Sequence, residues 1–143
     1  MKKKLKEELK VAMKAQDRLR LDTIRAVLSE IQYEEMQKSV DELSDAECLA
    51  VAQREVKKRN EAIQFTEQAG RAEEKQKLLA EIAILEFFLP KQLSSEDLEK
   101  IVVGLKDSTP GASMPIVMKH LKENYAGQYD GKSASEIVKR VLG

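Results

Sequence analysis

The chain has 143 residues, of which 35% are charged and 4% are aromatic, and it contains no tryptophan. This length fits one ordinary domain or two very small ones, and the composition is typical of helices with solvated outer faces, which argues against an all-β fold. The 25 basic and 25 acidic side chains cancel, so the whole molecule has no strong attraction for nucleic acid. The basic side chains gather at the two ends of the chain and in the stretch Arg54–Arg59.

The chain carries neither a disulfide pair nor a recognisable targeting or membrane segment. Its single cysteine, Cys48, has no partner for an intramolecular disulfide, and the lysine-rich start is followed by Glu7 and Glu8 instead of an apolar signal segment. No apolar run approaches the roughly 18 residues that a membrane span requires. We therefore expect a soluble, cytoplasmic protein.

The first 90 residues are predicted to form a bundle of four helices, spanning roughly residues 2–15, 18–38, 45–69 and 72–89. Leucine and isoleucine recur there at the three- and four-residue spacing of a buried helix face. Asp17 is expected to cap the second helix, and Ser44 with Glu47 has the pattern of a capping box for the third. Gly70 and Pro90 are expected to end the third and fourth helices.

Residues 91–143 are predicted to form a smaller unit of three helices, roughly 95–106, 114–124 and 134–142. Ser94 is expected to cap the first of them and Ser113 the second, while Ser133 and Glu136 have the spacing of a capping box for the third. Three helices with little apolar surface each need one another to bury it. The sequence therefore predicts an all-α fold, with an N-terminal bundle over 1–90 followed by the three-helix unit.

The chain offers no convincing catalytic, metal or cofactor site. The only histidine is His120 and the only cysteine is Cys48, and each stands inside a predicted helix without a catalytic signature around it. The sequence has no paired cysteine or histidine spacing for a metal, and Gly111 and Gly131 are isolated glycines outside any phosphate-binding cluster. We assign no catalytic residue, no metal ligand and no cofactor.

One charged pair is predicted inside the bundle. Arg25 and Glu81 each stand at the edge of a buried stripe, three or four residues from leucines on either side, so the two side chains are candidates for an interhelical ion pair. Two solvated side chains at stripe edges, or a ligand site, are the alternatives.

The second unit holds the best candidate for contact with RNA phosphates. Residues 111–143 contain five basic and three acidic side chains, and the basic ones are Lys119, Lys122, Lys132, Lys139 and Arg140. Lys132 is expected just before the start of the last helix, where backbone amides favour an anion. Tyr125 and Tyr129 stand nearby as RNA-facing rings or, alternatively, as packing at the core edge. The run Arg54–Arg59 is a second candidate, with a solvated helix face as its alternative.

Several stretches together resemble the GatB/YqeY family. The most specific is the Leu-Pro-Lys-Gln-Leu-Ser sequence of residues 89–94, and the likeness extends over nearly the whole chain. The other matching stretches are the helical opening over 5–31 with Arg25, the segment 54–65, and the closing segments 117–121, 130–132 and 137–139. The loop 107–114 departs from the family by being shorter and by carrying a proline.

The resemblance implies a two-part helical fold, shared with the tail of the B subunit of the tRNA-dependent amidotransferase, where the tail contacts tRNA away from the chemistry. It also brings the family's association with glutamine-dependent carbon–nitrogen ligases, whose catalytic parts lie outside such a tail. The expected function is therefore an accessory protein that binds tRNA and is not itself catalytic. The alternative is a helical module that docks on a synthetase, an amidotransferase or a ribosome-associated partner. An independent amide-transferring enzyme is disfavoured because no nucleophile is present.

Overall fold

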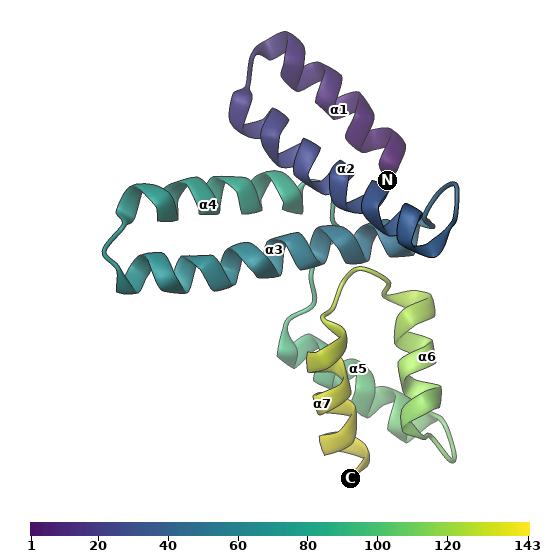
Figure 1. Cartoon of the computed structure of the whole chain (residues 1–143). Coiled ribbons are helices and arrows are strands. Elements are labelled where there is room, and N and C mark those ends of the chain that lie inside the picture. The colour runs from purple at the N-terminus through teal and green to yellow at the C-terminus, as the bar shows by residue number, and fades with distance from the viewer. The chain divides into compact units, whose positions relative to one another are not determined.

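A computed structural model describes all 143 residues and contains seven α-helices and no strand (Figure 1), which confirms the predicted all-α fold. The helices are α1 (Lys2–Ala15), α2 (Arg18–Lys38), α3 (Asp45–Gln68), α4 (Ala72–Glu86), α5 (Ser95–Ser108), α6 (Met114–Asn124) and α7 (Gly131–Leu142). The chain divides into two compact units, which are Met1–Leu89 and Pro90–Gly143.

The N-terminal unit consists of two helix pairs. Helix α1 packs against α2, α3 packs against α4, and α2 contacts both helices of the second pair. The buried core between them takes apolar side chains from all four helices, from the loop before α3 and from the turn after α4. Its buried members are Leu5, Ile24, Val27, Ile31, Leu43, Cys48, Val51, Leu85 and Phe88.

In the C-terminal unit, α7 packs against both α5 and α6. The buried core comprises Leu98, Val102, Val117, Leu121, Ala134, Ile137 and Val138. The segment before α5 is tied to the loop between α6 and α7 by two hydrogen bonds, from the Leu93 amide to the Gln128 carbonyl at 2.7 Å and from the Gln92 side chain to the Gly127 carbonyl at 2.6 Å. These bonds fix the loop that leads into α7.

Three predicted helix starts are confirmed. Asp17 accepts a hydrogen bond from the Arg20 amide at 3.2 Å, and Ser94 accepts one from the Asp97 amide at 3.1 Å. Ser44 and Glu47 form the complete capping box, because each side chain accepts a hydrogen bond from the other residue's amide, both at 3.2 Å. The cap residues therefore located these ends correctly.

Helix α5 extends two residues past its predicted end, to Ser108, and two other helix ends differ by three residues. Helix α4 ends at Glu86 instead of residue 89, because a proline disfavours helical geometry in the residue before it and the last turn tightens. Helix α7 begins at Gly131 instead of residue 134, because the Asp130 carboxylate accepts hydrogen bonds from the Ser133 amide at 3.3 Å and the Ser133 hydroxyl at 3.1 Å. The predicted Ser133 capping box is therefore wrong. Ser113 does precede α6, but its side chain makes no capping hydrogen bond.

Glu81 of α4 also forms its ion pair with a different residue from the one expected. Glu81 accepts a hydrogen bond from the Arg59 guanidinium at 3.0 Å, and their side chains are 17% and 13% exposed. Arg59 donates a further hydrogen bond to the carbonyl of Glu55 at 3.1 Å. Arg25, the expected partner of Glu81, is exposed on α2 and forms no ion pair in the structure. A helical wheel gives the face of each side chain but not the helix that lies opposite.

The corrected pairing predicts that Glu81→Ala destabilises the protein and Arg25→Ala does not. Loss of the Glu81 carboxylate leaves the largely buried Arg59 guanidinium with fewer partners, which should lower the free energy of unfolding by about 1–2 kcal/mol. Loss of the exposed Arg25 side chain should change it by less than about 0.5 kcal/mol. Urea unfolding followed by helical circular dichroism measures both, and equal losses for the two variants would contradict the assignment.

Candidate nucleic-acid interface

The five predicted RNA-binding side chains lie on the outer faces of α6 and α7 and are all exposed. On α7, Lys132 and Lys139 are seven residues apart, which places them on the same face about 10 Å apart along the axis. The opposite face of α7 is buried in the core through Ala134, Ile137 and Val138. Burial of that face therefore directs both lysines to solvent.

Ion pairs divide these five cations into two groups. Lys119 pairs with Glu123 on the same helix at 3.9 Å, and Arg140 pairs with Glu99 of α5 at 3.1 Å. The other three, Lys122, Lys132 and Lys139, form no ion pair in the structure. These three lysines carry the positive charge that is free to meet an anion.

The start of α7 is not the anion site that the sequence suggested. Lys132 lies inside the first turn of α7 and not before it, and the negatively charged Asp130 occupies the cap. The Asp130 carboxylate satisfies an amide that a phosphate would otherwise bind and adds a like charge beside it. Lys132 therefore contributes a point charge on the helix surface.

The two tyrosines of the second unit serve the core. Tyr125 and Tyr129 are partly buried and pack against the apolar cluster of this unit. Burial also raises the pKa of the Tyr129 hydroxyl above its ordinary value, because the charged form is less well solvated there. Packing at the core edge, the alternative to an RNA-facing role, is therefore the arrangement that the structure has.

The basic run Arg54–Arg59 is mostly neutralised by neighbouring carboxylates. Arg54 pairs with Glu34 of α2, Lys58 pairs with Glu55 at 3.0 Å, and Arg59 pairs with Glu81. The first of these pairs joins α3 to α2, and the last joins α3 to α4. Lys57 is the one basic residue of the run without an ion pair. Three of the four cations of this stretch therefore take part in a charge network of the N-terminal unit.

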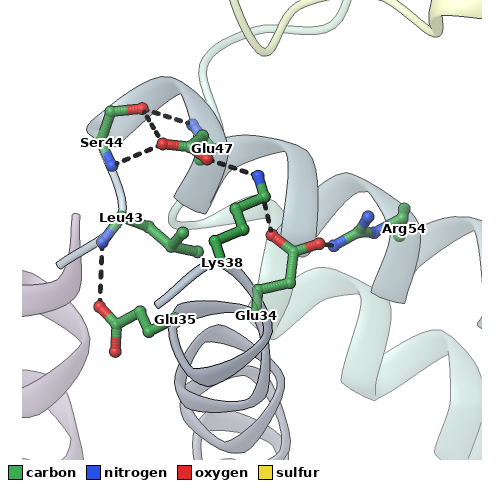
Figure 2. Close-up of polar contacts among 7 residues, drawn as sticks. All are labelled: Glu34, Glu35, Lys38, Leu43, Ser44, Glu47 and Arg54. Carbon is green, nitrogen blue, oxygen red and sulfur yellow. Dashed lines mark hydrogen bonds and ion pairs between the residues drawn. The ribbon is translucent and has the colours of Figure 1, made fainter. Parts of the chain in front are cut away.

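A second network lies where the chain passes from α2 to α3 (Figure 2). Lys38 contacts Glu47 at 2.5 Å and Glu34 at 3.9 Å, and Glu34 in turn pairs with Arg54. The hydrogen bond from Lys38, together with the bonds from Ser44, lowers the pKa of Glu47 to about 2. The same contact with Glu47 raises the pKa of Lys38. The Glu47 carboxylate is thereby held in its charged form as part of the helix cap.

Glu35 and Glu55 are buried charged residues that the sequence did not predict, and Glu35 makes the contacts that join separate segments. Glu35 is only 6% exposed, and it accepts hydrogen bonds from the Lys2 ammonium at 3.0 Å and from the Leu43 amide at 3.0 Å. These bonds lower its pKa below the ordinary value, with the Lys2 bond as the largest cause. The available signal was its position, because Glu35 continues the buried row of Ile24 and Ile31 along α2.

Cys48 lies in the N-terminal unit and His120 in the C-terminal unit. Cys48 is buried, and burial raises the pKa of its thiol, which disfavours the reactive thiolate. The His120 ring lies 3.4 Å from the side-chain amide of Asn124. No group of three or more His, Cys, Asp or Glu side chains is arranged to hold a metal ion, and none of the helices is long and apolar enough to span a membrane.

The lowered pKa of Glu47 predicts an acid-dependent loss of stability. A carboxylate with a depressed pKa in the folded state stabilises the fold above its ordinary value of 4.5, and this contribution is lost as the pH falls toward about 2. The melting temperature of the Glu47→Gln variant should therefore fall less steeply, between pH 4.5 and about 2, than that of the unmodified protein. Glu42→Gln, which changes an exposed neighbour, is the control, and identical pH profiles for both variants would contradict the assignment.

Comparison with known proteins supports the resemblance that the sequence motifs indicated. A family model described as Yqey-like protein matches residues 2–142. A search of curated proteins gives no match. The family match covers both helical units, including the residues of α6 and α7 described above. With all but its two terminal residues matched, the chain belongs to the YqeY-like protein family.

Proposed function

We propose that this chain is a tRNA-binding accessory protein, without catalytic activity of its own, that holds tRNA through the exposed face of α6 and α7. The observation that carries the proposal is the set of three exposed lysines without ion pairs, Lys122, Lys132 and Lys139. The resemblance to the tail of the amidotransferase B subunit supports tRNA as the ligand.

The chemistry of this surface favours contact with phosphates over reading of bases. Lysine ammonium groups act as flexible point charges that suit phosphates, whereas sequence is read by side chains that make hydrogen bonds and apolar contacts with the base edges. The adjacent tyrosines are engaged with the core, so this face presents no exposed ring for stacking. Affinity should therefore depend strongly on salt and weakly on tRNA sequence.

Replacement of Lys122, Lys132 and Lys139 with glutamine tests the proposal. The triple variant should bind tRNA more weakly, and the slope of log affinity against log salt should flatten by about 2–3 units if each lysine contacts one phosphate. Filter binding at several salt concentrations measures both quantities.

The matched control replaces Lys77, Lys91 and Lys100 with glutamine, because these three lysines are also exposed and without ion pairs but lie outside α6 and α7. This control should keep the slope of the unmodified protein. A loss as large as that of the first variant would mean that overall charge, and not this surface, sets the affinity.

A second candidate function is docking on another protein, and one surface favours it. Tyr33 and Met36 lie three residues apart in the last turns of α2, Val40 follows just after the helix, and the three side chains are 59%, 73% and 43% exposed. Exposed apolar side chains gathered at helical spacing are typical of a protein contact. This apolar row lies in the N-terminal unit and not on the lysine face of α6 and α7.

Replacement of Tyr33 and Met36 with glutamate distinguishes the two functions. If the chain docks on a protein, this variant should lose partners that the immobilised protein retains from a cell lysate at high salt, where contacts with phosphates are weakened. The glutamine variant of Lys122, Lys132 and Lys139 should retain them. If the variant with glutamate at both positions still retains the same partners, the apolar row is not the docking surface.

A further inference from the structure

We propose that Phe87, Lys4 and Arg20 form a second RNA contact, which stacks one unpaired base on the Phe87 ring. This inference rests on the proposed RNA-binding function but uses residues of the N-terminal unit. The three side chains come from α1, from α2 and from the turn that follows α4.

The backbone turn after α4 places the Phe87 ring at the surface. The two adjacent phenylalanines point in different directions, so that Phe88 is 7% exposed in the core and Phe87 is 52% exposed. The buried ring supports the exposed one, since the two ring centroids are 5.2 Å apart in an edge-to-face arrangement at 89°. The exposed Phe87 ring therefore packs against the buried Phe88 ring.

Two cations lie against this ring. The Lys4 ammonium is 4.6 Å from the Phe87 centroid, and the Arg20 guanidinium carbon is 5.1 Å from it. Arg20 also pairs with Glu8 at 3.1 Å, whereas Lys4 forms no ion pair. Phe65 and Tyr33 are also exposed, but neither has a cation over its ring. Phe87 thus combines an accessible ring with adjacent positive charge.

Helix α1 extends the positive charge away from the ring. It carries six lysines and two glutamates, and only Lys2 among the lysines is paired, to the buried Glu35. The remaining five are exposed and form no ion pair, which makes α1 the richest helix in free cations. They are Lys3, Lys4, Lys6, Lys10 and Lys14. A strand that stacks one base on Phe87 would find phosphate-binding groups along α1.

The combination of a ring and cations favours unpaired RNA over a lipid surface. Unpaired bases stack on aromatic side chains while the flanking phosphates meet lysine and arginine, and this mode tolerates any base. An amphipathic helix that enters a membrane surface must expose its apolar face. Leu5 and Ala12 of α1 are unavailable for that because each is 1% exposed, and only Val11 and Met13, at 55% and 52% exposed, remain as large apolar side chains on the outside of this helix.

The absence of tryptophan from the chain makes the site directly observable. In the Phe87→Trp variant of the whole 143-residue chain, the only tryptophan would report stacking through quenching of its fluorescence by a short single-stranded oligoadenylate. Phe65→Trp, at a position that is 73% exposed in α3, is the matched control and should be quenched little. Phe87→Leu, which keeps apolar bulk without a ring, should weaken binding of the oligonucleotide by roughly fivefold or more.

The possible results separate this site from the proposed tRNA function. The stacking proposal would be overturned if the tryptophans at residues 65 and 87 were quenched equally. It would also be overturned if a folded Phe87→Leu variant bound the oligonucleotide with unchanged affinity. A blue shift with anionic phospholipid vesicles and no quenching by RNA would assign the surface to lipid and also overturn it. If the unmodified chain retains tRNA but residue 87 is not quenched, only the stacking site fails. If residue 87 is quenched but tRNA is not retained, the proposed tRNA function fails and the stacking site stands.

Discussion

Three segments of the N-terminal unit meet at the carboxylate of Glu35. A charged group removed from water must be paired, and here the first turn of α1 supplies the Lys2 ammonium while the loop before α3 supplies the Leu43 amide. Both bonds require α1 to begin beside the end of α2. That placement directs Leu5 into the core and brings Lys4 to the Phe87 ring. The Lys2–Glu35 pair thus helps to set the position of the free lysines on α1.

The helices and most of their ends were predictable because they depend on neighbours in sequence. The Ser44 capping box and the Asp17 cap act within four residues, and the apolar spacing identified the buried faces. The start of α7 was not predictable in the same way, because Asp130 and Ser133 are both good caps three residues apart. The choice between them depends on the hydrogen bonds that hold the preceding loop to Leu93 and Gln92.

The candidate site was only partly predictable, because free charge is a property of the folded chain. The pairing of Lys119 with Glu123 follows from their spacing on one helix, but the pairs Arg140–Glu99 and Arg54–Glu34 join different helices. The run Arg54–Arg59 is dense in positive charge in the sequence and nearly neutral in the fold.

The distribution of ion pairs separates the response of folding to salt from the response of binding. Dissolved ions weaken the attraction between exposed charges, most of all beyond a Debye length. Partly buried pairs such as Lys2–Glu35 and Arg59–Glu81 are much less affected. The lysines that carry free charge are exposed and contribute little to packing. A rise in ionic strength would then detach a polyanion from a protein that remains folded, so that capture and release become reversible without any rearrangement of the helices.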